Sequence, residues 1–240
     1  MKRAPRTLLV VSAHSADFVW RAAGAIATFV ERGGRAHVVA LSYGERGESG
    51  ELWKEPDQTE ARVKEIRRGE AEAAAAALDA ELTSLDLGDY PLVVDHAAVE
   101  QLTALIRETA PQVILTHAAR DPFNPDHGVA HDATVRARVL ASGAGVASAF
   151  ETTAPPELLS FEPHQPELCG FVPTTFLDIT PVWEKKVAAM EAMGAQAYLR
   201  QYYSERAEHR ANHARRSSGR SDIRYAEAFQ RELPVVVDTL

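Results

Sequence analysis

Residues 7–17 read TLLVVSAHSAD, an apolar run followed at once by two side chains that can bind a metal ion. The run Thr7–Ser12 predicts a strand buried on both faces, as in the centre of a parallel sheet. From Phe18 to Arg32 apolar residues recur at helical spacing, and a pair of glycines ends the pattern. Residues Arg35–Ser42 then read as a second strand. The chain therefore opens with a β-α-β unit.

The same alternation continues through the next 75 residues or so, a length typical of two further β-α units. Thr59–Ala80 is dense in Ala, Glu and Arg and predicts a long helix. Further strands are expected at Leu82–Leu87 and Gln112–Thr116, with a helix over about Ala97–Thr109 between them. Strands and helices that alternate in this way predict an α/β fold, with a doubly wound, mainly parallel sheet and helices on both faces.

The pattern is less regular after Thr116, where two prolines interrupt it. A helix is expected to begin near His127. A late strand that runs into a loop is expected over Leu158–Pro166, a short strand at Thr175–Ile179, and a long amphipathic helix over Pro181–His213. We expect a single domain over residues 1–240, with a helical C-terminal region at about 181–232.

The composition excludes several classes of function. The net charge is −8, the sequence pI is near 5.6 and no basic block is present, which argues against a nucleic-acid surface. An anionic ligand would have to be held by a few local cations. Cys169 is the single cysteine, so an intrachain disulfide and a Cys-rich zinc module are excluded. The first apolar stretch is too short for a signal or membrane helix, so a cytoplasmic enzyme without a membrane partner is expected.

The first candidate for chemistry is the pair His14 and Asp17, which follows the first strand. Imidazole nitrogen and carboxylate oxygen suit zinc, and catalytic zinc sites have three protein ligands and one open position. The alternative is ordinary: histidine often follows a strand, and aspartate often caps a helix. The pair alone does not decide between them.

The second candidate is NPDHGVAH, residues 124–131. His127 and His131 are four apart and share one face of a helix that has begun by His127. Asp126 beside them can orient an imidazole. The alternative is a helix start capped by Asp126, with two surface histidines.

Two loops supply further ionisable groups. In YGERGES, residues 43–49, the glycines permit a tight backbone approach, Arg46 can bind a carboxylate and Glu48 can transfer a proton. In FEPHQPE, residues 161–167, His164 lies between two prolines on a rigid turn and can serve as an acid or a base. The alternatives are a solvated charged turn and a surface histidine.

The order of a strand, AHxxD, a helix, a strand, GERGES and PDHxxxH resembles the LmbE/PIG-L superfamily of zinc-dependent N-deacetylases. The resemblance covers roughly the first 170 residues and implies a Rossmann-like sheet. It also implies Zn²⁺ as the cofactor, held by His14, Asp17 and His127. The superfamily's general base falls on Ala16 and its catalytic histidine on Asn124, neither of which can transfer a proton. Deacetylation is therefore not expected.

The strings SAHSADFVWRA, LSYGERGES, GDYP, FEPHQPE and TFLDIT closely resemble a narrower group of this superfamily, the 4-oxalomesaconate hydratases. These enzymes of gallate and protocatechuate 4,5-cleavage catabolism add water to the double bond of a tricarboxylate, giving 4-carboxy-4-hydroxy-2-oxoadipate. The resemblance implies that Glu48 and His164 are the acid and base, in either order. Further candidates to contact the substrate are Arg46, Arg120, Asn124 and His131.

Several alternatives stay open. Arg120 is equally consistent with a surface ion pair, and His131 with a substitute metal ligand. The second hypothesis for the function is a zinc-dependent N-deacetylase of an N-acyl sugar or amine with relocated catalytic groups, and the third is a metal-free binding protein. The long helix expected after Pro181 leaves a homo-oligomer possible.

Overall fold

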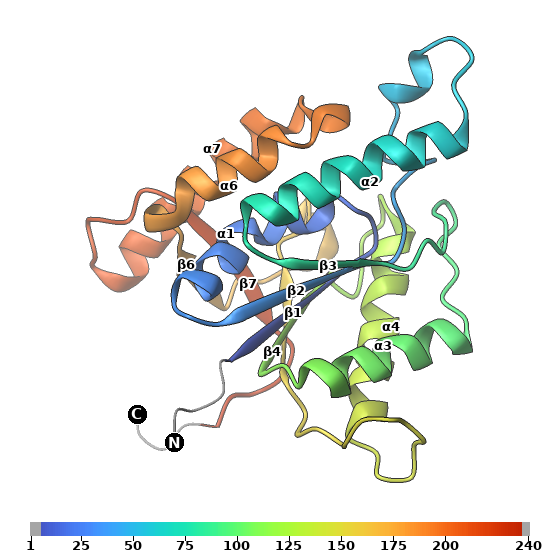
Figure 1. Ribbon diagram of the computed structural model, residues 1–240. Coiled ribbons are helices and arrows are strands. Elements are labelled where there is room, and N and C mark those ends of the chain that lie inside the picture. Colours follow the sequence, from blue (N-terminus) through green and yellow to red (C-terminus); the bar gives the residue numbers. More distant parts are fainter. Residues whose placement is uncertain (1–5, 237–240) are drawn as a thin grey trace.

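A seven-stranded sheet forms the centre of the computed structural model, which describes residues 6–236 (Figure 1). The strands are β1 (Thr7–Ser12), β2 (Arg35–Ala40), β3 (Glu81–Ser84), β4 (Val113–Thr116), β5 (Glu157–Phe161), β6 (Thr175–Asp178) and β7 (Ala226–Arg231). Their order is β3-β2-β1-β4-β5-β7-β6. The first five pair in parallel, whereas β7 is antiparallel to both of its neighbours. The predicted mainly parallel α/β sheet is confirmed.

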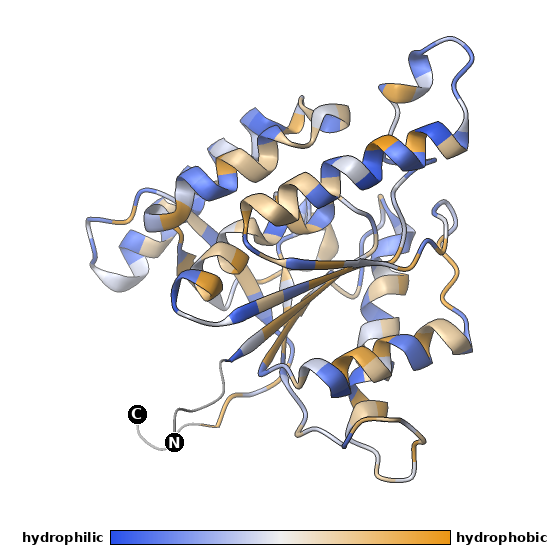
Figure 2. Cartoon of the chain, viewed as in Figure 1, coloured by the Kyte–Doolittle hydropathy of each residue, from blue (hydrophilic) through white to orange (hydrophobic). Residues whose placement is uncertain are grey.

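Helices cover both faces of the sheet (Figure 1). One face carries α1 (Asp17–Glu31), α2 (Glu60–Ala77), α6 (Trp183–Glu191) and α7 (Leu199–Ser218), and the other carries α3 (His96–Thr109) and α4 (Pro125–Ala141). Side chains alternate along β1, so that Leu8 and Val10 enter one core and Leu9 and Val11 the other. Figure 2 shows the apolar colouring of these central strands. A strand with two buried faces has to be apolar throughout.

The C-terminal region differs from the predicted long helix over Pro181–His213. The helix is broken between α6 and α7, where Met193 has a ψ of 65° that is incompatible with a helix. The backbone N–H of Ala195 donates to Glu70 Oε1 on α2 at 2.7 Å, which fixes the break. As a result Gln196 turns toward the ends of the strands.

The helical region expected up to about residue 232 is also incorrect, because residues 226–231 form β7. Glu227 is a charged residue at a buried position of this strand, so the sequence lacks the apolar pattern expected of a buried strand. Glu227 accepts hydrogen bonds from the backbone N–H groups of Gly24 and Ala25 at 2.8 Å and pairs with Lys186 at 2.6 Å. These partners lie far away in the sequence.

Two element boundaries differ slightly from the predicted ones. The helix expected near His127 begins at Pro125, with Asn124 at the N-cap position, and so the histidine lies in its first turn. The strand predicted to run into a loop over Leu158–Pro166 begins one residue earlier, at Glu157, and ends at Phe161, and the predicted loop leads into the short helix α5 (Pro166–Cys169). None of the helices within residues 6–236 is long and apolar enough to cross a lipid bilayer.

Candidate active site

A cavity of about 220 Å³ lies beyond the carboxyl ends of the parallel strands, and we call it the carboxyl-end cavity. Asp17 at the start of α1, Glu48 after β2, His127 on α4 and His164 after β5 all line it. Ligands of open α/β sheets bind at this edge because the loops that follow the strands meet there. Four residues expected to carry chemistry therefore share one cavity.

His14 is completely buried beside this cavity and is surrounded by carboxylates. Its Nδ1 lies 3.2 Å from Asp17 Oδ2 and 3.7 Å from Glu48 Oε1, and its Nε2 lies 3.3 Å from Asp126 Oδ2. Burial lowers the pKa of His14, but these three carboxylates outweigh burial and raise the pKa to about 10. The surroundings of His14 thus stabilise positive charge.

His127 is arranged in the same way on the opposite side of Asp17. Its Nδ1 lies 2.8 Å from Asp121 Oδ2, and its Nε2 lies 3.6 Å from Asp17 Oδ1. Burial raises the pKa of Asp121. The hydrogen bond and the charge of His127, together with smaller contributions from Phe123 and Arg21, outweigh burial and lower this pKa to about 2. Asp121 therefore stays charged and fixes the orientation of the His127 ring.

The donor atoms fit a divalent metal ion. Nδ1 of His14 and Nε2 of His127 are buried and have no hydrogen-bond partner in the part of the chain that the structure describes. Each ring contacts a carboxylate through its other nitrogen, an arrangement typical of metal-binding histidines. Among the described residues, ligand atoms within 4.8 Å of one another form two groups, His14 with Glu48 and His127, and Asp17 with His117 and His127. Both groups combine two imidazole nitrogens with one carboxylate oxygen, a set that suits zinc.

His117, at the end of β4, was not identified from the sequence. It is buried, stacks on His127 with ring centroids 4.0 Å apart, and places Nε2 3.2 Å from Asp17 Oδ2. The backbone N–H of Ala13 donates to this Nε2 at 2.9 Å, which occupies its lone pair. Burial holds the pKa of His117 well below its usual value. His117 is therefore a neutral ring that supports the site, and it is a poorer candidate for a ligand than His14.

Glu48 is held by two side-chain amides. Asn124 Nδ2 donates to its Oε1 and Gln196 Nε2 donates to its Oε2, both at 2.8 Å. Asn124 lines the cavity, as expected of a residue near the substrate, and it also positions this carboxylate. Gln196 reaches Glu48 only because the helix is broken between α6 and α7.

The glycines of GERGES permit close packing, as predicted. Gly44 has a φ of +71°, and a Cβ atom there would lie 2.9 Å from the Cβ of Glu48 and 3.2 Å from that of His14. At Gly47 a Cβ atom would overlap the ring of Tyr90. Asp89 accepts hydrogen bonds from the backbone N–H of Gly47 at 2.7 Å and from that of the preceding residue. The loop is thus fixed with Glu48 directed into the cavity.

His164 is half-buried in the carboxyl-end cavity and stacks on Tyr202, with ring centroids 4.1 Å apart. Its backbone carbonyl accepts hydrogen bonds from the Tyr202 hydroxyl and, at 2.9 Å, from Arg206. Arg206 also pairs with Glu162 at 2.7 Å. Burial, followed by the charges of Arg21 and Arg206, lowers the pKa of His164. The ring is therefore mainly neutral at neutral pH.

Arg21 is a further residue that was not identified from the sequence. It is buried, lies one helical turn after Asp17 and places Nε 3.5 Å from Asp17 Oδ1. Burial lowers the pKa of Arg21, but Tyr203, Asp17 and other acidic groups outweigh this effect and raise it. Among the described residues, Arg21 is the one arginine or lysine that lines the cavity. The i,i+4 spacing from Asp17 is the signal that could have identified it.

Three residues predicted to contact the substrate do not line the cavity. Arg46 points away from it and pairs with Glu60 at 3.2 Å on the surface, because the loop that turns Glu48 inward turns Arg46 outward. Arg120 is exposed. His131 lies one turn further along α4, about 6 Å from His127 along the helix axis, and its Nδ1 is 3.3 Å from its neighbour Asp132.

Residues 9–138 match the model of the PIG-L family, described as GlcNAc-PI de-N-acetylase. A Pseudomonas putida protein named 4-oxalmesaconate hydratase is 45% identical over all of this chain and 94% of its own length. The chain belongs to the PIG-L family. Among further relatives, a 1D-myo-inositol 2-acetamido-2-deoxy-alpha-D-glucopyranoside deacetylase of Thermomonospora curvata is 32% identical over 59% of this chain and 55% of its own.

Two solved structures share the fold of this chain. The crystal structure of GalB, the 4-carboxy-2-hydroxymuconate hydratase of Pseudomonas putida, has a TM-score of 0.96 and 45% identity, and covers 98% of this chain and 99% of its own. The conserved protein TT1542 of Thermus thermophilus has a TM-score of 0.78 at 22% identity over 96% of each chain, which shows a shared fold. The family resemblance noted in the sequence is thus confirmed.

Proposed function

We propose that this chain is a hydratase that adds water to the carbon–carbon double bond of 4-oxalomesaconate, giving 4-carboxy-4-hydroxy-2-oxoadipate in gallate and protocatechuate catabolism. The full-length similarity to a hydratase supports this reaction. The observation that carries it is that Glu48 and His164 line the same cavity as Asp17 and His127, two of the side chains proposed to hold the metal. The family's own acid and base positions, Ala16 and Asn124, cannot transfer a proton.

Zinc is the cofactor that we assign to this reaction. His14 Nδ1, a carboxylate oxygen of Asp17 and His127 Nε2 would hold it. Asp126 and Asp121 keep both rings in orientation. When bound, the ion supplies a Lewis acid that polarises oxo and carboxylate oxygens of the substrate. Every other step belongs to side chains of the protein.

Arg21 is the group best placed to bind a carboxylate of the substrate. Its guanidinium has a planar fork that matches a carboxylate, and its buried Nε has no hydrogen-bond partner in the described chain. The protein has a net charge of −8, so an anionic substrate depends on such a local cation. We therefore assign the binding of a substrate carboxylate to Arg21 and not to Arg46 or Arg120, which do not line the cavity.

Glu48 and His164 would divide the proton transfers. Both oxygens of Glu48 already accept hydrogen bonds from amides, and their remaining lone pairs can accept a proton from the attacking water. His164 then delivers a proton to the adjacent carbon. Its pKa is depressed in the free protein, and a bound tricarboxylate brings negative charge that raises the pKa and favours the protonated ring.

The direct test follows the absorbance of the conjugated double bond of 4-oxalomesaconate. We expect the absorbance to fall with the protein present, and not after metal removal by a chelator. Restoration by added Zn²⁺ controls for damage by the chelator. Unchanged absorbance at one metal ion per chain would contradict the hydratase.

The second candidate is an N-deacetylase, which is favoured by the deacetylases among the relatives. Its weakness is Ala16, which is 1% exposed and packs into the apolar core where the family has a base. Release of acetate from an N-acetylated amino sugar, measured on the same preparation, distinguishes the two reactions. Substantial acetate release without loss of the alkene would favour the deacetylase.

A further inference from the structure

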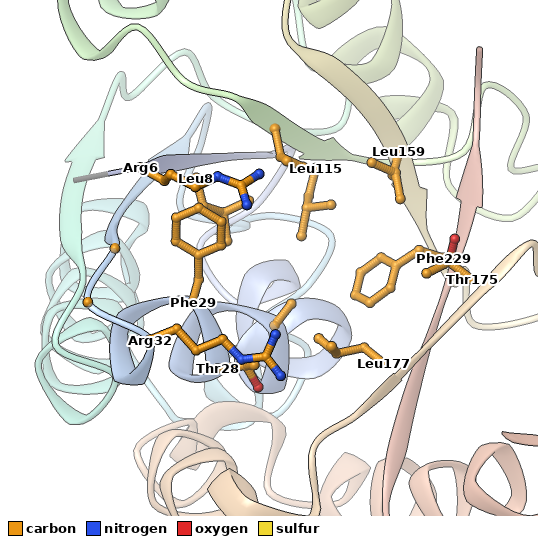
Figure 3. Close-up of a pocket in the computed structure, with 14 residues that line it drawn as sticks. Arg6, Leu8, Thr28, Phe29, Arg32, Leu115, Leu159, Thr175, Leu177 and Phe229 are labelled. Carbon is orange, nitrogen blue, oxygen red and sulfur yellow. The ribbon is translucent and has the colours of Figure 1, made fainter. Parts of the chain in front are cut away.

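A second cavity of about 340 Å³ lies at the opposite, amino end of the parallel strands, and we call it the amino-end cavity (Figure 3). It is enclosed by the last turns of α1 and by one face of the sheet. Most of its wall is apolar, with Leu115, Leu159, Leu177 and Phe229 facing α1 across the cavity. It shares no lining residue with the carboxyl-end cavity. Its volume lies in the lower range of small-molecule sites.

Three polar groups converge on this apolar space. The guanidinium groups of Arg6 and Arg32 border it from the start of β1 and the end of α1 (Figure 3). Neither arginine forms an ion pair with any residue in the range 6–236. Thr28, also in the wall, has a buried hydroxyl oxygen without a hydrogen-bond partner among the described residues. A hydroxyl buried without a partner is rare and indicates a missing one.

We propose that the amino-end cavity binds a small monocarboxylate with an apolar body. Arg6 and Arg32 are exposed and form no ion pair within residues 6–236, and the Arg6 guanidinium lies 5.8 Å from the centre of the Phe29 ring. These two cations and the Thr28 hydroxyl in the same wall match a carboxylate, and the leucine and phenylalanine side chains match a hydrocarbon chain. Inorganic anions would leave the apolar wall in water, and an uncharged lipid would leave both arginines without a counter-charge. The overall charge of −8 repels anions, so the two arginines decide the recognition.

The ligand would contact the helix that also bears the metal site. Asp17 and Arg21 lie in the first two turns of α1, whereas Thr28 and Phe29 line the amino-end cavity near its other end. Asp17 and Phe29 are 12 residues apart, about 18 Å at 1.5 Å per residue, whereas Arg21 of one cavity and Ala25 of the other are one helical turn apart. The binding site is therefore separate from the one used for catalysis, and it does not depend on the function proposed above.

Isothermal titration calorimetry with octanoate tests the proposal, with 1-octanol as the uncharged probe of the same chain length. We expect saturable binding of octanoate with a Kd below about 1 mM and at least tenfold weaker binding of 1-octanol. The double variant Arg6→Gln/Arg32→Gln should bind octanoate at least tenfold more weakly. Arg35→Gln is the matched control, since Arg35 is an exposed arginine outside the cavity. Its binding should equal that of the wild type.

Arg21→Gln distinguishes the two cavities, because octanoate held at the catalytic site would be lost in this variant. Retained binding in Arg21→Gln together with loss in the double variant supports the proposal. No saturable binding of octanoate, equal binding of 1-octanol, or unchanged binding by the double variant would overturn it. Circular dichroism of each variant verifies that the fold is intact.

Discussion

The two sides of the carboxyl-end cavity are built differently. On the side proposed to hold the metal, called the metal side, His14, Asp17 and His127 are at most 2% exposed, and Asp126 and Asp121 fix the two rings. On the proton-transfer side, the Glu48 side chain is 19% exposed, and its partners lie 76 and 148 positions away in the sequence.

His164 on that second side is held by groups from α7. The metal side is made of short motifs that follow β1 and β4, two neighbouring strands of the sheet, whereas the proton-transfer side depends on the C-terminal half. The difference indicates how one fold serves different reactions. On this proposal, the ligand positions stay in place while the side chains opposite them differ between reactions.

The largest effect is expected on the metal side. His14→Ala should remove most of the bound metal and lower turnover by more than about 10³-fold, since the remaining two ligands hold zinc poorly. Elemental analysis of the purified variant measures the metal, with about one ion per chain expected in the wild type. His131→Ala is the matched control and should retain its metal. Undiminished metal in His14→Ala would exclude His14 as a ligand.

Substitutions on the proton-transfer side should separate chemistry from metal binding. Glu48→Gln and His164→Asn should each lower kcat by about 10²–10⁴-fold with unchanged metal content, because each removes one acid or base. Steady-state assays and elemental analysis on the same samples test both statements. Glu51→Gln changes an exposed glutamate of the same loop and should leave kcat unchanged. Near-normal turnover in both variants would exclude Glu48 and His164 as the acid and base.

A smaller effect is expected where the two sides meet. Arg21→Gln should raise KM by about 10–100-fold, the range for one lost charged hydrogen bond, with a lesser effect on kcat. Arg46→Gln provides the comparison, because its side chain pairs with Glu60 at the surface. Initial rates over a range of substrate concentrations give KM and kcat for both variants. A raised KM in Arg46→Gln and a normal one in Arg21→Gln would reverse the assignment.

The smallest effect concerns the support of His164. Burial lowers the pKa of His164 and the charge of Arg206 lowers it further, so Arg206→Gln should raise this pKa. The limb of the kcat/KM profile that reports His164 should therefore move to higher pH, and kcat should fall several-fold through looser positioning. Arg206→Lys keeps the charge and should keep the position of the limb.

Arg200→Gln, an exposed change on the same helix, is the matched control and should give the wild-type profile. A limb that does not move in Arg206→Gln would show that Arg206 acts on the fold alone.

The sequence by itself determined the fold class and predicted the side chains that we propose as metal ligands. Strands buried on both faces are continuous apolar runs, and helices repeat every 3.6 residues, so local patterns predicted β1, β2 and α1–α4 to within a few residues. His14 and Asp17 come directly after β1, His127 lies in the first turn of the helix that follows β4, and parallel strands end at one edge. Their convergence followed from the topology.

Only the tertiary structure decided the rest. The break before α7, the strand β7 with its buried Glu227, and the choice of Arg21 over Arg46 depend on contacts between residues far apart in the sequence. The hydrogen bond from Ala195 to Glu70 ends the helix at a point where the local sequence would continue it, and Gln196 therefore reaches Glu48. Periodicity reports which face of an element is buried, but not which distant group satisfies a buried charge. Such pairings form when the elements pack together.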